Sequence, residues 1–307
     1  MIAPIALFVF KRPDLMKRTL DALVMNSLAA QSPLFIFSDG PRSPDDVEII
    51  ENLRAMAGEV KGFASVTVLA AEKNQGLSKS IIAGVTMLTE RFGRCIVLED
   101  DIVTSPYFLT FMNAALDKYA NDHRVAAISG YTPNLNTPLP DTFFQLDAEC
   151  WGWATWARAW GRFNPDGRAL MSQLRQRGLL SFFDHYGTSD YVEMLHQQIT
   201  GRNDSWAVRW RASVILAGML SLYSGRSLTR NIGFNNSGEH SQSQQAHIWD
   251  VELLEVPVTL GDIAVVHSEA GFQAFKRFHF HHKPSGWVGF KRHIRRLLRA
   301  CVVGLYF

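Results

Sequence analysis

The chain has 307 residues, of which 47% are apolar and 20% are charged, as in a folded soluble protein with one large or two small domains. No stretch reaches the ~18 to 20 uninterrupted apolar residues of a spanning helix, which excludes an integral membrane protein. The three cysteines, Cys95, Cys150 and Cys301, have neither a paired framework nor metal-ligand spacing. They predict a reducing compartment and no structural disulfide.

Strand and helix signals alternate along the first hundred residues. Apolar runs of strand length are followed by segments with apolar residues at helical spacing. We expect strands at 2–10, 34–37, 66–69 and 95–98, and helices at 14–30, 44–57 and 78–92. This alternation predicts an α/β, Rossmann-like fold, in which helices cover both faces of a mostly parallel sheet and ligands bind beyond the carboxyl ends of the strands.

Polar residues follow each of these expected strands. They are Lys11-Arg12, Ser38-Asp39, Asn74-Gln75-Gly76 and Glu99-Asp100-Asp101. Three adjacent carboxylates repel one another and raise each other's pKa, which a hard divalent cation with oxygen ligands would relieve. The acidic triplet 99–101 therefore predicts a metal site of the kind that holds a diphosphate, and the alternative is an acidic turn that faces water.

Positive charge is concentrated at the end of the chain. Residues 271–307 contain eight Lys or Arg and no acid, which leaves residues 1–270 at a net charge of −6 because the whole chain is +2. Apolar and basic residues alternate there at helical spacing, which predicts a basic amphipathic helix. Residues 288–307 would bind an anionic membrane surface, or the helix would dock on the domain. Nucleic-acid binding is not expected, since no basic patch elsewhere extends the footprint.

Six motifs in order resemble a known family across roughly residues 2–245. They are Phe8-Val9-Phe10-Lys11-Arg12-Pro13, Phe37-Ser38-Asp39-Gly40, Asn74-Gln75-Gly76-Leu77, Val97-Leu98-Glu99-Asp100-Asp101, Cys150-Trp151-Gly152-Trp153-Ala154-Thr155-Trp156 and Asn231-Ile232-Gly233-Phe234. The chain resembles GT-A glycosyltransferases, specifically bacterial enzymes similar to animal N-acetylglucosaminyltransferase I. The resemblance implies a nucleotide-sugar donor, usually a UDP-sugar, and Mn²⁺ or Mg²⁺ between the diphosphate and the acidic motif.

The resemblance also assigns roles to residues at the donor end. Arg12 would hold a phosphate, Asp39 would accept a hydrogen bond from uracil, and Asp101 would bind the metal directly. Contacts to the donor are implied for Asn74, Gly76 and Ser78, and contacts to sugar hydroxyls, ribose or metal-bound water for Glu99 and Asp100. Ordinary alternatives are a surface arginine, a turn-forming aspartate, and a helix cap at Ser78.

Four tryptophans lie within ten residues. Sugars pack on aromatic rings, so Trp151 and Trp153 are candidate sugar contacts, whereas Trp156 and Trp160 are expected in the core. The candidate general base is Asp204, which serves equally well as an N-cap for a helix that begins near Trp206. The resembling family often has its acid directly after the tryptophan, where this chain has Ala207. Asp190 and Glu149 are the reserve candidates.

The segment 231–240 is rich in glycine and amide side chains and is expected to be a mobile loop. Within it, His240 would return to the metal or diphosphate, or lie exposed. His279, His281 and His282 are interpreted as surface or interfacial residues and not as a zinc site.

Together these patterns predict a GT-A domain over 1–270, with a nucleotide-sugar half at 1–130 and an acceptor half at 131–270, and a basic tail at 271–307. We expect a metal-dependent, inverting glycosyltransferase that acts on a glycan or lipid-linked acceptor, as in lipopolysaccharide synthesis, in the cytoplasm at the inner face of the membrane. The alternatives are a catalytically silent glycan-binding module and a sugar-phosphate nucleotidyltransferase.

Overall fold

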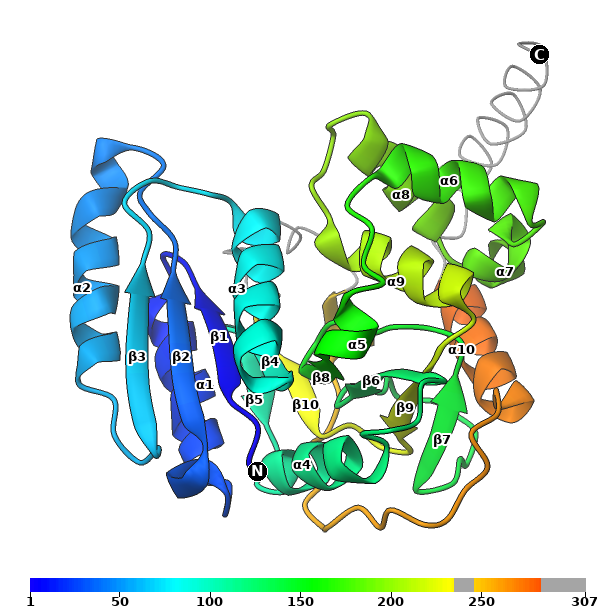
Figure 1. Ribbon diagram of the computed structural model, residues 1–307, viewed down its shortest axis with the longest axis horizontal. Helices are drawn as coiled ribbons and strands as arrows, with labels where there is room; N and C mark the ends of the chain where they lie inside the picture. Colours follow the sequence, from blue (N-terminus) through cyan, green and yellow to red (C-terminus); the bar gives the residue numbers. More distant parts are fainter. Residues whose placement is uncertain (235–245, 283–307) are drawn as a thin grey trace.

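A computed structural model describes residues 1–234 and 246–282, and its centre is a mixed sheet flanked by helices (Figure 1). The eight-stranded sheet in this part of the chain has the order β3-β2-β1-β4-β8-β6-β9-β7. The strands are β1 Ile5–Val9, β2 Pro33–Ser38, β3 Ser65–Ala70, β4 Arg94–Glu99, β6 Val125–Ser129, β7 Thr142–Gln145, β8 Trp153–Trp156 and β9 Leu220–Ser224. A small second sheet pairs β5 Ile102–Thr104 with β10 Thr229–Asn231.

The expectation of a mostly parallel sheet is confirmed. Strands β3, β2, β1, β4, β6 and β9 run in one direction, and β8 and β7 run against them. Because β8 is inserted antiparallel between β4 and β6, its amino end lies at the edge where its neighbours have their carboxyl ends. The loop that precedes β8 is thereby brought to the edge where α/β sheets bind ligands.

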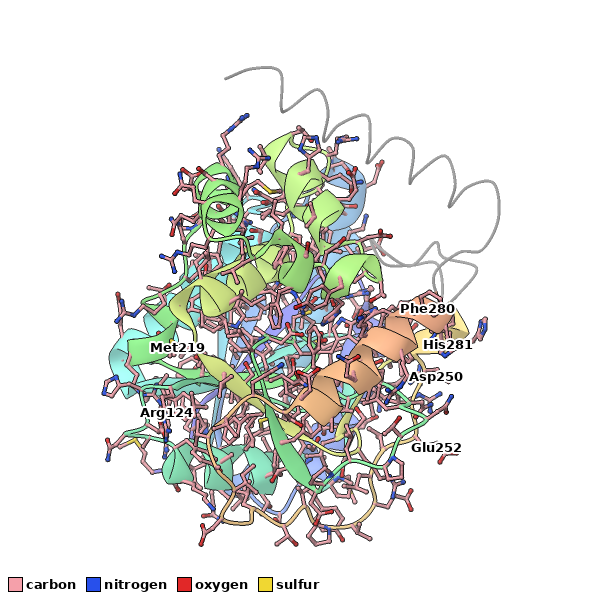
Figure 2. The ribbon with its side chains drawn as sticks, turned by 90° about the vertical axis from the view of Figure 1, so that its right-hand side faces the viewer. Arg124, Met219, Asp250, Glu252, Phe280 and His281 are labelled. Carbon is pink, nitrogen blue, oxygen red and sulfur yellow. The ribbon has the colours of Figure 1, made fainter. Side chains whose placement is uncertain are left out.

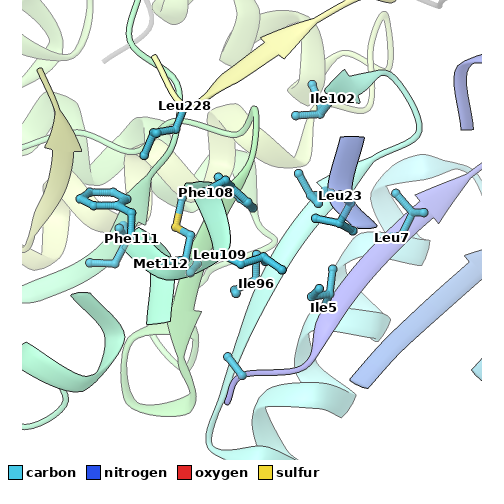
Figure 3. Close-up of a cluster of buried hydrophobic side chains, with 14 of the residues drawn as sticks. Ile5, Leu7, Leu23, Ile96, Ile102, Phe108, Leu109, Phe111, Met112 and Leu228 are labelled. Carbon is cyan, nitrogen blue, oxygen red and sulfur yellow. The ribbon is translucent and has the colours of Figure 1, made fainter. Parts of the chain in front are cut away.

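Helices cover both faces of the sheet. They are α1 Pro13–Val24, α2 Val47–Gly58, α3 Leu77–Phe92, α4 Phe108–Lys118, α5 Ala157–Trp160, α6 Gly167–Gln176, α7 Leu180–Phe183, α8 Tyr191–Ile199, α9 Trp206–Ala217 and α10 Glu269–His281. Alternate strand residues point to opposite faces. Leu7 and Ile96 therefore pack with α1, α2 and α4, as Figure 3 shows in part, whereas Phe8 and Val97 pack with α3, α5 and α9.

Two predicted helices have different bounds in the structure. The helix expected at 14–30 ends at Val24, and a short 3₁₀ turn follows at Ala29–Gln31. Between them the side chain of Asn26 accepts from the backbone N–H of Leu109 at 2.9 Å and is buried, so it ties this turn to α4. The helix expected at 44–57 begins with a separate 3₁₀ turn at Pro44–Asp46.

The predicted boundary of a separate tail at Gly271 is wrong, because α10 belongs to the folded domain. Phe275 and Phe278 on α10 are buried, and the Phe275 ring packs on Phe143 of β7 at a centroid distance of 6.5 Å. Figure 2 shows α10 lying along the sheet, with Phe280 exposed near its end. Residues 283–307, which include the predicted membrane-binding segment 288–307, lie outside the described residues. Nowhere in 1–234 or 246–282 does a helix combine the length and apolar character needed to cross a bilayer.

Candidate functional site

The acidic triplet follows the central strand β4 at the carboxyl edge of the sheet. Glu99 is the last residue of β4, and its pKa is raised well above its usual value by burial and then by the charges of Asp101 and Asp100. Burial also raises the pKa of Asp100 to about 7, against the opposing effect of Arg12. The triplet is therefore an enclosed concentration of carboxylates and not the water-facing turn that was the alternative.

Arg12 faces the triplet from the end of the neighbouring strand β1. One guanidinium nitrogen, NH1, donates to Oδ2 of Asp101 at 2.8 Å, and the other, NH2, donates to Oδ1 of Asp100. Burial opposes the charge of Arg12, but the two carboxylates outweigh it and raise its pKa. Arg12 thus lies at the predicted site and is ion-paired, which rules out the alternative of an unattached surface arginine.

Asp100 makes its hydrogen bonds to groups at the end of β1 and on α1. Its carboxylate accepts from the backbone N–H of Phe10 at 3.0 Å and from Arg12, and its carbonyl accepts from the hydroxyl of Thr19 at 2.8 Å. The residue is 2% exposed. The prediction that Asp100 contacts a sugar hydroxyl, ribose or metal-bound water is therefore corrected: its carboxylate holds the end of β1 and positions Arg12.

Asp39 joins the loop after β2 to the loop after β3. Its carboxylate accepts from the backbone N–H groups of Gly40 at 2.8 Å, Gln75 at 2.7 Å and Gly76 at 2.9 Å, and from the side-chain amide of Asn74 at 3.0 Å. Four donors use most of the capacity of a carboxylate. Gly76 has φ 80°, a region that favours glycine. The tight loop therefore depends on the carboxylate of Asp39 and on the glycine at position 76. The uracil contact of Asp39 stays a prediction.

Ser78 does not cap α3, whose N-cap is Gly76 without a side-chain hydrogen bond. The Ser78 hydroxyl instead accepts from Arg209 of α9 at 2.5 Å. The same Arg209 nitrogen pairs with Asp204 at 3.0 Å. Asp204 is not a helix cap either, because Ser205 caps α9 by accepting from the N–H of Val208. The Asp204 side chain is 63% exposed, and its ion pair in the described part of the chain is with Arg209. The reserve candidate Asp190 is the residue that directly precedes α8.

The loop before β8 brings Glu149 to Trp151 toward the triplet. Trp153 pairs with Val97, and a Cβ on Gly152 would lie 3.3 Å from the side chain of Leu98, so the loop that enters β8 runs beside the end of β4. Consistent with this placement, the charges of Glu99 and Asp101 contribute to the raised pKa of Cys150, after burial and Glu149.

The carboxyl group of Glu149 has a raised pKa. Burial raises its pKa to about 7, although the backbone N–H of Cys150 opposes the shift by donating to its carboxylate at 2.9 Å. This reserve candidate thus has a pKa close to neutrality, and Asp147 and Arg211 are the charged side chains that act on it.

Trp151 and Trp153 have different surroundings. Trp151 is half-buried, with the rings of Tyr131, Phe234 and Trp249 edge-on around it at centroid distances of 4.6, 5.7 and 5.9 Å. Trp153 has no exposed surface, and its ring packs on Trp206 at 5.4 Å. The prediction that Trp153 contacts a sugar is wrong, because its ring fills the core. Trp156 and Trp160 are in the core, as predicted.

Strand β10 closes the site on the side of Asp101. The backbone N–H of Ile232 donates to the carbonyl of Asp101 at 2.8 Å. A Cβ on Gly233 would lie 2.1 Å from Oδ2 of Asp101, so only glycine fits without displacing that carboxylate. The motif 231–234 therefore contacts the triplet, and Asn231 belongs to a strand rather than to the predicted loop. His240 lies outside the described residues.

A buried ion pair near Glu149 was missed from the sequence. Arg211 of α9 bonds to Asp147, and His185 lies 3.7 Å from the same carboxylate. Burial opposes ionisation of Asp147, but Arg211 and His185 outweigh it and hold its pKa at about 2. His279, which was expected to be a surface or interfacial residue, is half-buried and stacks on His185 at a centroid distance of 4.9 Å. Pairs this distant in sequence leave no local signal.

The residues at the triplet fit a divalent cation in charge and donor type. No group of three or more His, Cys, Asp and Glu within 1–234 and 246–282 is already arranged around one point. Asp101, however, lies at the rim with an 11% exposed side chain, and its carboxylate offers the oxygen donors that Mn²⁺ and Mg²⁺ prefer. The backbone of Gly233 lies directly against the same carboxylate.

Comparisons with known proteins find low similarity. No protein-family model and no curated protein matches the chain. Mannosyltransferase PcManGT from Pyrobaculum calidifontis, in complex with GDP-Man and Mn²⁺, matches at 10% identity over 71% of this chain and 69% of that chain, with a TM-score of 0.39. S. aureus TarS matches at 12% identity over 48% of this chain and 25% of that chain, with a TM-score of 0.33.

TarS 1-349 in complex with UDP-GlcNAc matches at 13% identity over 46% of this chain and 38% of that chain, with a TM-score of 0.32. The match therefore spans well under half of either TarS chain. Because these similarities are low, a function for this protein has to rest on the residues of its site.

Proposed function

We propose that the protein is a glycosyltransferase that uses a nucleotide-sugar, most simply a UDP-sugar, as donor. The observation that carries the proposal is the arrangement of Arg12 and the acidic triplet at the carboxyl ends of the adjacent strands β1 and β4. A nucleoside diphosphate needs positive charge for its phosphates and an acidic group for a bridging metal. Both are present within one hydrogen-bonded cluster, at the edge where α/β sheets bind ligands.

Donor binding would use the loops after β1, β2 and β3. Arg12 supplies a planar guanidinium for a phosphate. Asp39 fixes the loop 74–76, so that Asn74 and Gly76 present a rigid wall to the nucleotide. Ser78 reaches the same region through Arg209, which adds a second cation close to the amino end of α3.

Asp101 would hold Mn²⁺ or Mg²⁺, with Glu99 close enough to bind metal-coordinated water or a sugar hydroxyl. When bound, the cation would neutralise charge on the leaving diphosphate. His240 as a second ligand stays a prediction. The residues of this chain would contribute orientation: Asp100 holds Arg12, and Gly233 lets the backbone lie directly against the Asp101 carboxylate.

Glu149 is a better candidate for the general base than Asp204. A base that works near neutral pH needs a pKa close to 7 and a place next to the reacting atoms. Glu149 has a pKa of about 7 and precedes Cys150, which senses the charges of the triplet. Asp204 is exposed and paired with Arg209. We therefore assign the deprotonation of the acceptor hydroxyl to Glu149, for an inverting transfer.

The acceptor is proposed to be a saccharide or glycolipid that packs on Trp151. This indole lies in the loop that precedes β8 and is half-buried, so part of its surface is available to a sugar. A cytoplasmic, membrane-associated site of action, through residues 288–307, stays part of the proposal.

The test is donor turnover. Purified protein is incubated with Mn²⁺ and single UDP-, GDP- or CMP-sugars, and release of free nucleotide is measured with and without a mixture of glycan acceptors. We expect release from one nucleotide class, and loss of that release in Asp101→Asn. Turnover of none of the donors, together with retained glycan binding, would contradict the proposal and favour a catalytically silent glycan-binding module.

A further inference from the structure

Arg12 occupies one of the two carboxylate oxygens that Asp101 could offer to a cation. Its NH1 donates to Oδ2 of Asp101 at 2.8 Å, while NH2 bonds to Asp100. A guanidinium and a divalent cation compete for the same lone pairs and repel each other at such short range. The ion-paired arrangement is therefore incompatible with a metal on that oxygen.

The two carboxylates are held to different degrees. Asp100 is 2% exposed and is also fixed by the N–H of Phe10, so its pair with Arg12 is anchored inside the protein. Asp101 lies further out, and within 1–234 and 246–282 Arg12 is the hydrogen-bond donor of its carboxylate. The bond to Asp101 is therefore the one that Arg12 can give up at least cost, since the guanidinium stays attached to Asp100.

The backbone at Lys11 and Arg12 has a defined conformation. The preceding residue, Lys11, has φ 54°, an uncommon conformation for a residue other than glycine, and its ammonium pairs with Asp46. Arg12 is the N-cap residue of α1 with its side chain free of any capping bond. The backbone is thus fixed, and the contacts of the long side chain are made by its guanidinium end.

We propose that Arg12 is an exchangeable arm that blocks the cation site in the absence of donor. When a nucleoside diphosphate binds, the NH1 side of the guanidinium moves from Asp101 to a phosphate oxygen, and the divalent cation takes the freed carboxylate. This inference rests on the proposed function for the identity of the nucleotide. Metal and nucleotide then bind cooperatively, because each ligand breaks the Arg12–Asp101 ion pair and frees the partner that the other ligand needs.

The first experiment measures Mn²⁺ binding without nucleotide, from the loss of the free-ion signal in electron paramagnetic resonance. Arg12→Met should bind Mn²⁺ about tenfold more tightly than the wild type, or better. The matched control is Arg124→Met, which removes the same charge from an exposed pair with Asp122 before β6, at the opposite edge of the sheet (Figure 2). The control should bind Mn²⁺ as the wild type does.

A second series adds UDP. In the wild type, UDP should tighten Mn²⁺ binding about tenfold or more. In Arg12→Met the ratio of the Mn²⁺ affinities with and without UDP should fall toward one. Arg12→Lys keeps the charge but lacks the fork that bridges two carboxylates, so it serves as a second variant if Arg12→Met folds poorly. Its Mn²⁺ affinity should lie between those of the wild type and Arg12→Met. Adding Asp101→Asn to Arg12→Met should abolish the gain in Mn²⁺ affinity over the wild type.

Equal or weaker Mn²⁺ binding by both Arg12 variants, with the fold intact by circular dichroism, would overturn the exchange. A gain in Mn²⁺ affinity with no UDP effect in any protein would support the blocking contact and count against the proposed donor. The two failures are therefore distinguishable.

Discussion

Replacement of Glu149 by glutamine should abolish the base while preserving the size of the side chain. With a pKa of about 7, Glu149 is ~9% ionised at pH 6 and ~91% ionised at pH 8. The rate of sugar transfer by the wild type should therefore rise about tenfold between these pH values. Glu149→Gln should lose about 10²- to 10⁴-fold in kcat, the usual contribution of a general base, and should lose this pH dependence.

The assay follows nucleotide release at saturating donor from about pH 5.5 to about pH 8.5. Asp204→Asn tests the competing assignment, and Glu48→Gln on α2 is a neutral control, because it removes an exposed carboxylate at the far side of the sheet. We expect the acidic limb of the profile to persist in both. A Glu149→Gln variant with wild-type kcat and an unchanged pH profile would refute the reasoning, as would a loss confined to Asp204→Asn.

Two further predictions concern stability and the shape of the site. Arg211→Met removes the arginine partner of the buried Asp147 and leaves His185, at 3.7 Å, as its ionisable neighbour, so the free energy of unfolding should fall by about 3 to 5 kcal/mol in urea titrations. The exposed Arg124→Met should change it little, and equal losses would contradict the assigned burial. Gly233→Ala places a Cβ against Asp101, so sugar transfer should slow by about a hundredfold at nearly unchanged stability, whereas a wild-type rate would show that the carboxylate is not required in its present position.

Much of the fold of residues 1–130 could be predicted from the sequence because its signals are local. Short apolar runs define β1 to β4, and each is followed within a few residues by the polar groups that the sheet gathers at one edge. Arg12, Asp39 and the triplet were found in this way. Their partners were not, since the bond of Arg12 to Asp101 joins residues 89 positions apart and depends on which strands become neighbours.

The fold of residues 131–270 was predicted less well, for physical reasons. The antiparallel insertion of β8 has no local signature, yet it determines that Glu149 and Trp151 reach the site. The tryptophan cluster suggested a sugar platform, but Trp153 is core because an inward strand position at the sheet centre demands a large apolar side chain. The basic composition after residue 270 concealed α10, whose Phe275 packs on Phe143 of β7 while Arg277 is exposed.

The most direct test of the account is calorimetric titration with UDP, GDP and CMP, with and without Mn²⁺, on the wild type and on Asp101→Ala. The account predicts UDP binding that requires Mn²⁺ and is lost in Asp101→Ala. The absence of nucleotide binding under every condition, by a protein that still binds glycans, would contradict it and leave a glycan-binding module as the better explanation.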